Sequence, residues 1–214
     1  MLWGKERKFP LGINIAKTND QWIYGDRAIR DFCYSFEKLY RVADYITINI
    51  SCPNAHAGKS FEDRPALNEL LCALNEIHSF RDKPVLVKVS PNNTYKSLDG
   101  ILDVSEQIGV SGYIISNTLS GKVKGGWSGK PLRKKSTDII RYVKRRLPDT
   151  NIIGVGGIFS AEDAYETLKV GASLVQVFTG LVYEGPGLVK KINNGLVKMI
   201  EERGLSSLEE LRND

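Results

Sequence analysis

The sequence contains few of the features that mark a membrane protein, a disulfide scaffold or a metal site. None of its apolar runs approaches the roughly 20 residues that a membrane-spanning helix needs. The start, MLWGKERKFP, lacks the apolar block of a signal peptide. The three cysteines are an odd number without CxxC spacing, and they form no ligand set with the two histidines. We therefore expect a cytoplasmic protein without a structural metal, in which Cys33 and Cys72 pack on apolar helical faces and are buried.

The sequence also lacks a segment in which its basic residues are concentrated. The net charge is +5 and the pI is about 9.0, but the basic residues are spread over segments 5–8, 130–135 and 141–146. A nucleic-acid-binding protein should carry a localised basic face. The charge pattern therefore favours a solvated surface and predicts no nucleic-acid partner.

Short apolar runs alternate with segments of helical spacing along the whole chain. Each apolar run is typical of a buried strand, and the spacing of apolar residues between the runs is typical of amphipathic helices. Such alternation predicts an α/β protein with a parallel sheet. The predicted strands are Leu11–Ile15, Tyr45–Ile50, Val85–Val89, Tyr113–Ser116, Ile152–Val155 and Leu174–Phe178.

Polar residues or glycines stand at the C-terminal end of almost every predicted strand. A closed barrel gathers these ends around one mouth, whereas an open sheet spreads them along a line. The pattern favours a (β/α)8 TIM barrel, with residues 1–214 as a single domain. Six strands are visible where the barrel has eight, and a complete barrel takes about 250 residues. We therefore expect about the first two βα units to be missing from this chain.

The segment DYITINISCPN places a polar cluster directly after a strand. Asn49 and Asn54 can each donate and accept hydrogen bonds, so they could hold a flat, amide-rich ring while the thiol of Cys52 handles a proton. Lys88 is the basic residue within the apolar strand PVLVKVS. It either reaches solvent or stabilises negative charge on a bound ring.

Two glycine turns predict a phosphate site. In IIGVGGI, the backbone N–H groups of Gly156 and Gly157 could bind an anion at the start of a helix for which Ser160 is a plausible N-cap. A second turn of this kind follows the next strand at Thr179 and Gly180. The loops after the last two strands of such barrels often bind phosphate. The loop GGWSGKPL, residues 125–132, either lies free on the surface or packs over a ligand.

Taken in order, these motifs resemble the dihydroorotate dehydrogenase family, flavin-dependent (β/α)8 barrel enzymes of pyrimidine (UMP) biosynthesis. The resemblance runs from LGINIAK through NISCPN, VLVKVSP, IISNT, GGWSGKPL and IIGVGG to SLVQVFTGLVYEGPGL, and so covers nearly the whole chain. It implies an oxidoreductase that removes a proton from C5 of dihydroorotate through Cys52 and passes a hydride from C6 to FMN.

The resemblance also implies a set of binding residues. Lys88 would lie by the pyrimidine edge of the flavin, and Gly156, Gly157, Phe178 and Thr179 would hold its phosphate. The implied FMN contacts are Asn14, Asn49, Lys88, Ser116, Ser128, Gly129, Gly156, Gly157, Phe178 and Thr179. The implied orotate contacts are Asn49, Asn54, Asn117 and Thr118.

Two parts of the resemblance disagree about the subclass. A cysteine at the base position is typical of the soluble class 1, whereas GGWSGKPLRKKSTDIIR and ASLVQVFTGLVYEGPGLVKKI resemble the membrane-associated class 2, which usually carries serine there. A thiol with a pKa of about 8.5 can fill the base position without new machinery. The longer match favours class 2 with Cys52 as base and a quinone as electron acceptor. The alternative is a class 1 enzyme that uses fumarate or NAD.

The N-terminal region of the family is not among these 214 residues. In class 2 enzymes it supplies two barrel strands, further flavin contacts and the helical membrane and quinone module. We therefore expect a partial sequence that by itself binds FMN poorly. We also expect the full-length form to contact the inner face of the cell membrane only through that region. The oligomeric state is left open, a homo-oligomer included.

Three other readings remain. Another FMN barrel, such as a dihydropyrimidine dehydrogenase domain, would use a cysteine as acid, but Asn54 and the triplet at 116–118 favour the orotate enzymes. A tRNA dihydrouridine synthase would explain the basic charge but should carry a localised basic face. A non-catalytic phosphate-binding barrel fragment would not need a polar set such as Asn49, Cys52 and Lys88.

Overall fold

The computed structural model describes residues 8–51, 61–120 and 126–214. The chain divides into two compact units. The first consists of Met1–Val89 and Asn93–Gly112, and the second of Ser90–Asn92 and Tyr113–Asp214.

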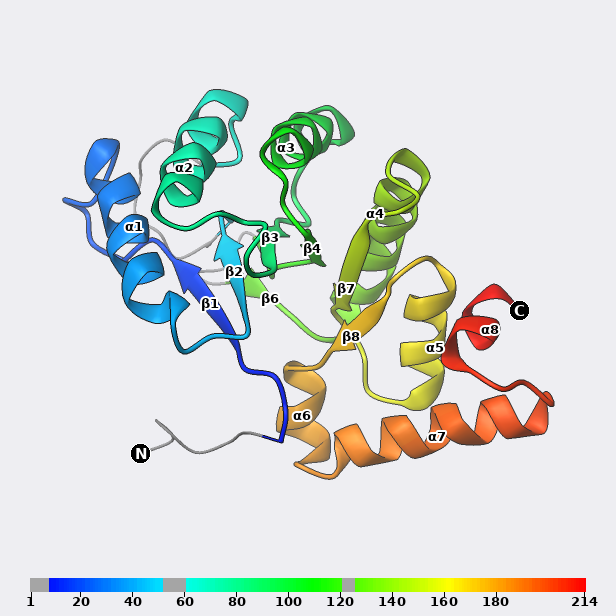
Figure 1. The fold of residues 1–214 in the computed structure, drawn as a ribbon. Coiled ribbons are helices and arrows are strands. Elements are labelled where there is room, and N and C mark those ends of the chain that lie inside the picture. Colours follow the sequence, from blue (N-terminus) through cyan, green and yellow to red (C-terminus); the bar gives the residue numbers. More distant parts are fainter. Residues whose placement is uncertain (1–7, 52–60, 121–125) are drawn as a thin grey trace. The chain divides into compact units, whose positions relative to one another are not determined.

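The first unit is a run of three βα repeats (Figure 1). Its strands are parallel and neighbour one another in the order β1-β2-β3. The elements are β1 (Gly12–Ala16), α1 (Asp26–Tyr40), β2 (Tyr45–Asn49), α2 (Arg64–Ile77), β3 (Val85–Val89) and α3 (Tyr95–Ile108). Glycine at position 109, with a φ of 89°, ends α3 in the left-handed conformation that suits a residue without a side chain.

The two faces of this sheet differ in chemistry. Successive side chains of a strand alternate between faces, so Ile15, Ile48 and Val87 share one face. All three are buried, as are the apolar stripes of the helices, among them Phe32, Phe36, Leu67, Leu70, Leu71, Leu74, Leu98 and Ile101. The apolar face and the helices thus form the core of the first unit. The opposite face of the sheet carries the polar side chains that are described in the next section.

The second unit contains the later repeats and a short hairpin (Figure 1). Strands β7 and β8 are parallel, and β4 lies beside β7, where the Ser116 N–H donates to the Val155 carbonyl over 3.0 Å. The elements are β4 (Gly112–Ile115), β5 (Leu119–Ser120), β6 (Gly126–Trp127), a 3₁₀ turn (Lys130–Leu132), α4 (Arg133–Arg146), β7 (Asn151–Val155), α5 (Ala161–Lys169), β8 (Leu174–Gln176), α6 (Thr179–Glu184), α7 (Leu188–Glu202) and α8 (Leu208–Asn213).

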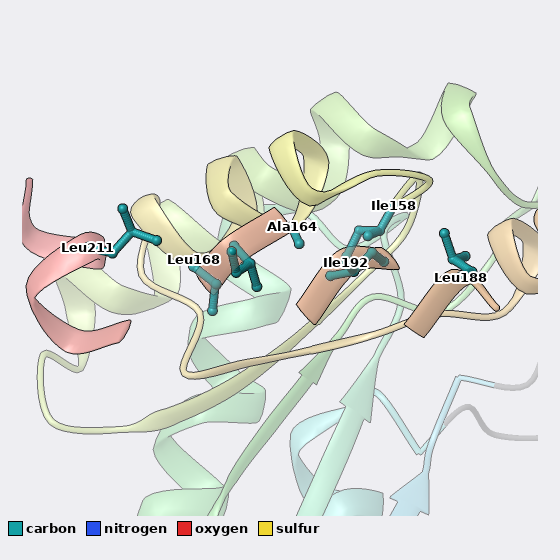
Figure 2. Close-up of a cluster of buried hydrophobic side chains, with 7 residues drawn as sticks. Ile158, Ala164, Leu168, Leu188, Ile192 and Leu211 are labelled. Atoms are coloured by element: carbon teal, nitrogen blue, oxygen red, sulfur yellow. The ribbon is translucent and has the colours of Figure 1, made fainter. Parts of the chain in front are cut away.

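A hydrophobic cluster joins α5, α7 and α8 within the second unit. Figure 2 shows side chains from the three helices directed toward one another. The cluster consists of Ile158, Ala164, Leu168, Leu188, Ile192, Leu196 and Leu211. Ile158 belongs to the loop between β7 and α5, so this packing holds one side of that loop in place.

All six predicted strands are confirmed, with ends that differ by at most two residues. Four strands and α-helices of the described part of the chain were not predicted: the antiparallel strands β5 and β6, of which β6 falls within the segment expected to be a loop, and helices α6 and α8. The prediction that Cys72 is buried is wrong, because its side chain is exposed on α2, while Cys33 is half-buried. In the part of the chain that the structure describes, none of the helices has the length and apolar character to span a bilayer.

Candidate functional site

Three predicted site residues share one face of the first unit's sheet. The register pairs Ala16 with Asn49 and Asn49 with Lys88, and Asn14 lies two residues before Ala16 on the same side of β1. Asn14, Asn49 and Lys88 therefore stand on the face opposite the buried Ile15, Ile48 and Val87. The parallel strands bring two amides and one amine to a common surface.

Hydrogen bonds tie the C-terminal ends of β2 and β3 together. The Oδ1 of Asn49 accepts from the N–H of Ser51 over 3.3 Å, and the Ser51 hydroxyl donates to the Lys88 carbonyl over 3.3 Å. The Asn49 side chain is thus held by the backbone that follows it, while Ser51 links this turn to the neighbouring strand. These bonds connect the Asn49 side chain, through Ser51, to the backbone at Lys88.

Lys88 has an environment that disfavours its charge. Burial lowers the pKa of the Lys88 ammonium from its ordinary value of 10.5. The electrostatic attraction between a cation and an anion is stronger when the cation is desolvated, because the surrounding dielectric is lower. Lys88 is therefore suited to stabilise negative charge on a ligand that lies against this face.

In the second unit, Ser116 is fixed from the side of α4. Its hydroxyl and that of Ser136 are 2.8 Å apart, and both residues are buried. A Cβ atom added to Gly156 would lie only 2.6 Å from the Ser136 Oγ. The end of β4, the first turns of α4 and the glycine turn after β7 are therefore packed against one another without spare room.

The turn at Gly156 and Gly157 can be built only with glycine. Their φ angles are 130° and 73°, which L side chains rarely adopt. A Cβ on Gly157 would lie 2.6 Å from the Arg133 Cβ and 3.1 Å from its Cα. Arg133 thus fills the side on which a side chain would stand, and glycine is what allows the turn to lie this close to α4.

The predicted cap of the following helix is confirmed. The Ser160 Oγ accepts from the Asp163 N–H over 3.3 Å, and the Asp163 carboxylate accepts from the Phe159 N–H over 2.8 Å. The backbone N–H groups of Phe159 and Asp163, at the start of α5, therefore already donate to side chains of the protein. The predicted anion would consequently meet the glycine backbone more than the helix end, which refines the expectation from sequence.

A second group of predicted residues meets beside the same turn. The Thr179 hydroxyl donates to the Ser128 Oγ over 2.9 Å, and Gly129, with a φ of 79°, would bring a Cβ to 3.1 Å from the Thr179 methyl group. A Cβ on Gly180 would collide with the Ile158 carbonyl. The loop before α4, the β7–α5 loop and the start of α6 thus converge. We call the set formed by Ser128, Gly129, Gly156, Gly157 and Thr179 the glycine cup.

Other predicted residues are placed differently. Asn117 makes a local turn, in which its Oδ1 accepts from the Thr118 N–H over 3.0 Å. Phe178 precedes α6 and is 73% exposed, so it is not packed against the cup. Cys52 and Asn54 lie outside the described residues.

Two residues that shape the cup were missed. Ser136 interrupts the apolar stripe of α4. A polar residue in line with Leu132, Ile139 and Ile140 is unusual, and this pattern could have identified Ser136 from the sequence. Arg133 forms ion pairs with residues of α5 that are 30 or more positions away, and no local pattern indicates such pairs.

Comparisons with known proteins agree on one family. The family model described as dihydroorotate dehydrogenase matches residues 2–200. Among curated proteins, the chain is 39% identical to a dihydroorotate dehydrogenase (quinone) of Trichodesmium erythraeum over 94% of this chain and 57% of that protein. It is 37% identical to the protein of the same name from Natronomonas pharaonis, over 95% of this chain and 59% of that protein.

A solved structure agrees with these matches. The chain is similar to the ligand-free dihydroorotate dehydrogenase of Eimeria tenella, with a TM-score of 0.85 and 27% identity over 96% of this chain and 64% of the other. The fold is thus a partial (β/α)8 barrel, as the strand ends predicted. This chain spans less than two thirds of the length of each of these proteins.

Proposed function

This chain belongs to the dihydroorotate dehydrogenase family, and on that premise we propose that residues 1–214 form the FMN-binding barrel domain of an enzyme that oxidises dihydroorotate to orotate. The observation that carries the proposal is the glycine cup. Five positions that the family resemblance assigns to flavin binding come from three separate loops, and the described structure packs them around one turn. A chance resemblance of motifs would not require this convergence.

The cup fits a phosphate group. Gly156 and Gly157 contribute only backbone atoms to it, and Ser128 and Thr179 contribute hydroxyls that are hydrogen-bonded to each other. Backbone N–H groups and hydroxyls are the donors that phosphate oxygens accept from. In this proposal the cup holds the FMN phosphate, Phe178 adds an apolar contact next to it, and Ser116 binds closer to the ring.

The polar face of the first unit fits the flavin ring. Asn14 and Asn49 offer amides that can match the ring's donors and acceptors, and Lys88 offers a cation with a lowered pKa. Lys88 would stabilise negative charge that builds up on the ring's pyrimidine edge. Asn49, Asn54, Asn117 and Thr118 would hold dihydroorotate, again through amide and hydroxyl groups.

The chemistry divides between the chain and the cofactor. Cys52 acts as the base that accepts the proton leaving C5 of dihydroorotate. FMN, when bound, supplies the acceptor for the hydride that leaves C6. The asparagines keep C5 directed at the cysteine and hold the substrate plane still, which lowers the entropy cost of the transfer.

The proposed electron acceptor is a quinone. The curated relatives are named dihydroorotate dehydrogenase (quinone), and the identity is 34–39% across those with this name. The residue at position 52 supports a second candidate, a class 1 enzyme that uses fumarate or NAD, because cysteine is the base that the resemblance assigns to that class. Turnover of dihydroorotate with a short-chain quinone, fumarate or NAD⁺ as the added oxidant separates the two.

The test uses the protein together with any in-frame upstream segment of its gene. We expect purified protein to contain FMN and to reduce a quinone with dihydroorotate, but not with dihydrouracil, as the electron donor. Cys52→Ala should lower turnover by about 10²–10⁴-fold while FMN stays bound, since general bases contribute that much. Cys72→Ala is the matched control, because Cys72 is exposed on α2. Equal turnover of Cys52→Ala and the control would refute the role of Cys52.

A further inference from the structure

Behind the glycine cup lies an ion-pair network that the proposed function does not use. Arg133, the first residue of α4, pairs through its two terminal nitrogens with Asp163 and with Glu166 on α5, the latter over 2.5 Å. Glu166 is largely exposed, whereas the Asp163 side chain is 13% exposed and that of Arg133 28%. The pair with Asp163 is therefore shielded from water.

The same two residues support the cup's backbone directly. The Asp163 carboxylate accepts the Phe159 N–H over 2.8 Å, two residues after Gly157. Arg133 packs against the turn as well, because a Cβ on Gly157 would lie 3.1 Å from the Arg133 Cα. Arg133 and Asp163 thus both contact the turn, and the ion pair links them to each other.

Charge gives the network a second consequence. The first turn of α5 carries Glu162 and Asp163, next to a turn proposed to receive a dianionic phosphate. Without a counter-charge, a poorly solvated carboxylate here would repel that phosphate through a medium of low dielectric. Lys130 is directed at an aromatic ring, with its Nζ 5.3 Å from the centre of the Phe159 ring. Arg133 is the cation that the structure places on Asp163.

We propose that Arg133 is a positioning residue that makes the glycine cup selective for a phosphorylated flavin: it neutralises Asp163 and holds that carboxylate on the Phe159 N–H, so that the cup's own donors face an anion without a competing negative charge behind them. This rests on the proposed function, because it takes the cup to be the site of the FMN phosphate. Arg133 contacts the turn and not the ligand.

The experiment measures the Kd of FMN and of riboflavin, which lacks the phosphate, by quenching of flavin fluorescence. The variants are Arg133→Ala, Asp163→Asn and the double variant, all made in the protein form of the test above, with any in-frame upstream segment of its gene included. Asn at position 163 still accepts the Phe159 N–H but carries no charge. Arg141→Ala is the matched control, because Arg141 lies on the same helix and pairs only with the exposed Asp138 among the ion pairs described for it.

We expect wild type to prefer FMN to riboflavin, and Arg133→Ala to lose about tenfold in FMN affinity, the size typical of coupled charges. Its riboflavin affinity should change less than about twofold, because riboflavin has no phosphate to repel. Asp163→Asn in the Arg133→Ala background should recover the preference for FMN, and Arg141→Ala should keep it.

Each other outcome is decisive. If wild type shows no preference for FMN, the phosphate assignment of the proposed function fails, and this inference fails with it. If wild type prefers FMN but Arg133→Ala weakens both flavins equally, the proposed function stands and Arg133 is merely structural. Should Arg133→Ala not fold, Arg133→Gln with Asp163→Asn carries the test: wild-type preference supports the proposal, and a tenfold loss contradicts it.

Discussion

Replacing Gly157 with alanine probes the cup's construction most directly. The φ of Gly157 is 73°, and alanine in this region costs about 1–2 kcal/mol. Alanine also restricts the unfolded chain, which offsets about 0.4–1 kcal/mol of that cost. Conformation alone should therefore destabilise the folded state by about 1 kcal/mol.

The surroundings of Gly157 add a steric cost to this. The new methyl group would lie 2.6 Å from the Arg133 Cβ and 3.1 Å from the Arg133 Cα, so a helix backbone and not a flexible side-chain tip would have to move. Overpacking of this kind costs about 1–3 kcal/mol. The sum predicts a loss of about 2–4 kcal/mol in the free energy of unfolding.

Gly204 provides a matched control for this substitution. Its φ is 65°, and no atom lies within 4 Å of an added Cβ. Gly204→Ala should therefore lose only the conformational part, about 1 kcal/mol, or about 2–4 °C in melting temperature. Urea unfolding of both variants, followed by circular dichroism, gives the comparison. If Gly157→Ala costs no more than Gly204→Ala, the close packing of Arg133 on the turn is refuted.

Two further predictions concern titrating side chains. Because burial lowers the pKa of Lys88, the unfolded state binds this proton more tightly than the folded state, and the stability penalty is largest when the lysine is charged. In flavin-free protein, Lys88→Met should thus raise the melting temperature at pH 7, and the gain should shrink as the pH rises toward 10.5; a gain that grows with pH contradicts this. Burial, with a smaller effect of Glu76, raises the pKa of the Cys33 thiol, whereas Cys72 is exposed. Iodoacetamide should therefore modify Cys72 at least about tenfold faster than Cys33 at pH 7.5, as measured by peptide mass spectrometry, and equal rates would argue against the assigned burial.

The strands could be predicted because their signal is local. Val85–Val89 is a continuous apolar run except for Lys88, with a proline before it and a serine after it, and the structure has a strand with the same ends. The cap at Ser160 was equally local, since the donor that it binds is three residues away. Site residues at strand ends followed from the fold class, because parallel strands deliver them to the same edge.

The features that escaped prediction depend on distant contacts or on very short elements. Strands β5 and β6 have two residues each, too few for alternation to be detected. The ion pair between Arg133 and Asp163 spans 30 positions. Cys72 follows Leu71 in α2, at the border of the apolar stripe, where spacing alone does not separate a buried residue from an exposed one.

The glycine cup restricts how its affinity can evolve. Gly156 and Gly157 contribute no side chain that could be exchanged, and any carbon added at either position meets a neighbouring residue. If the cup holds the FMN phosphate as proposed, selection on the affinity of this turn must act on residues packed against it, such as Arg133 and Ser136. Natural variation in cofactor affinity should then accumulate in this supporting layer, while the two glycines stay invariant.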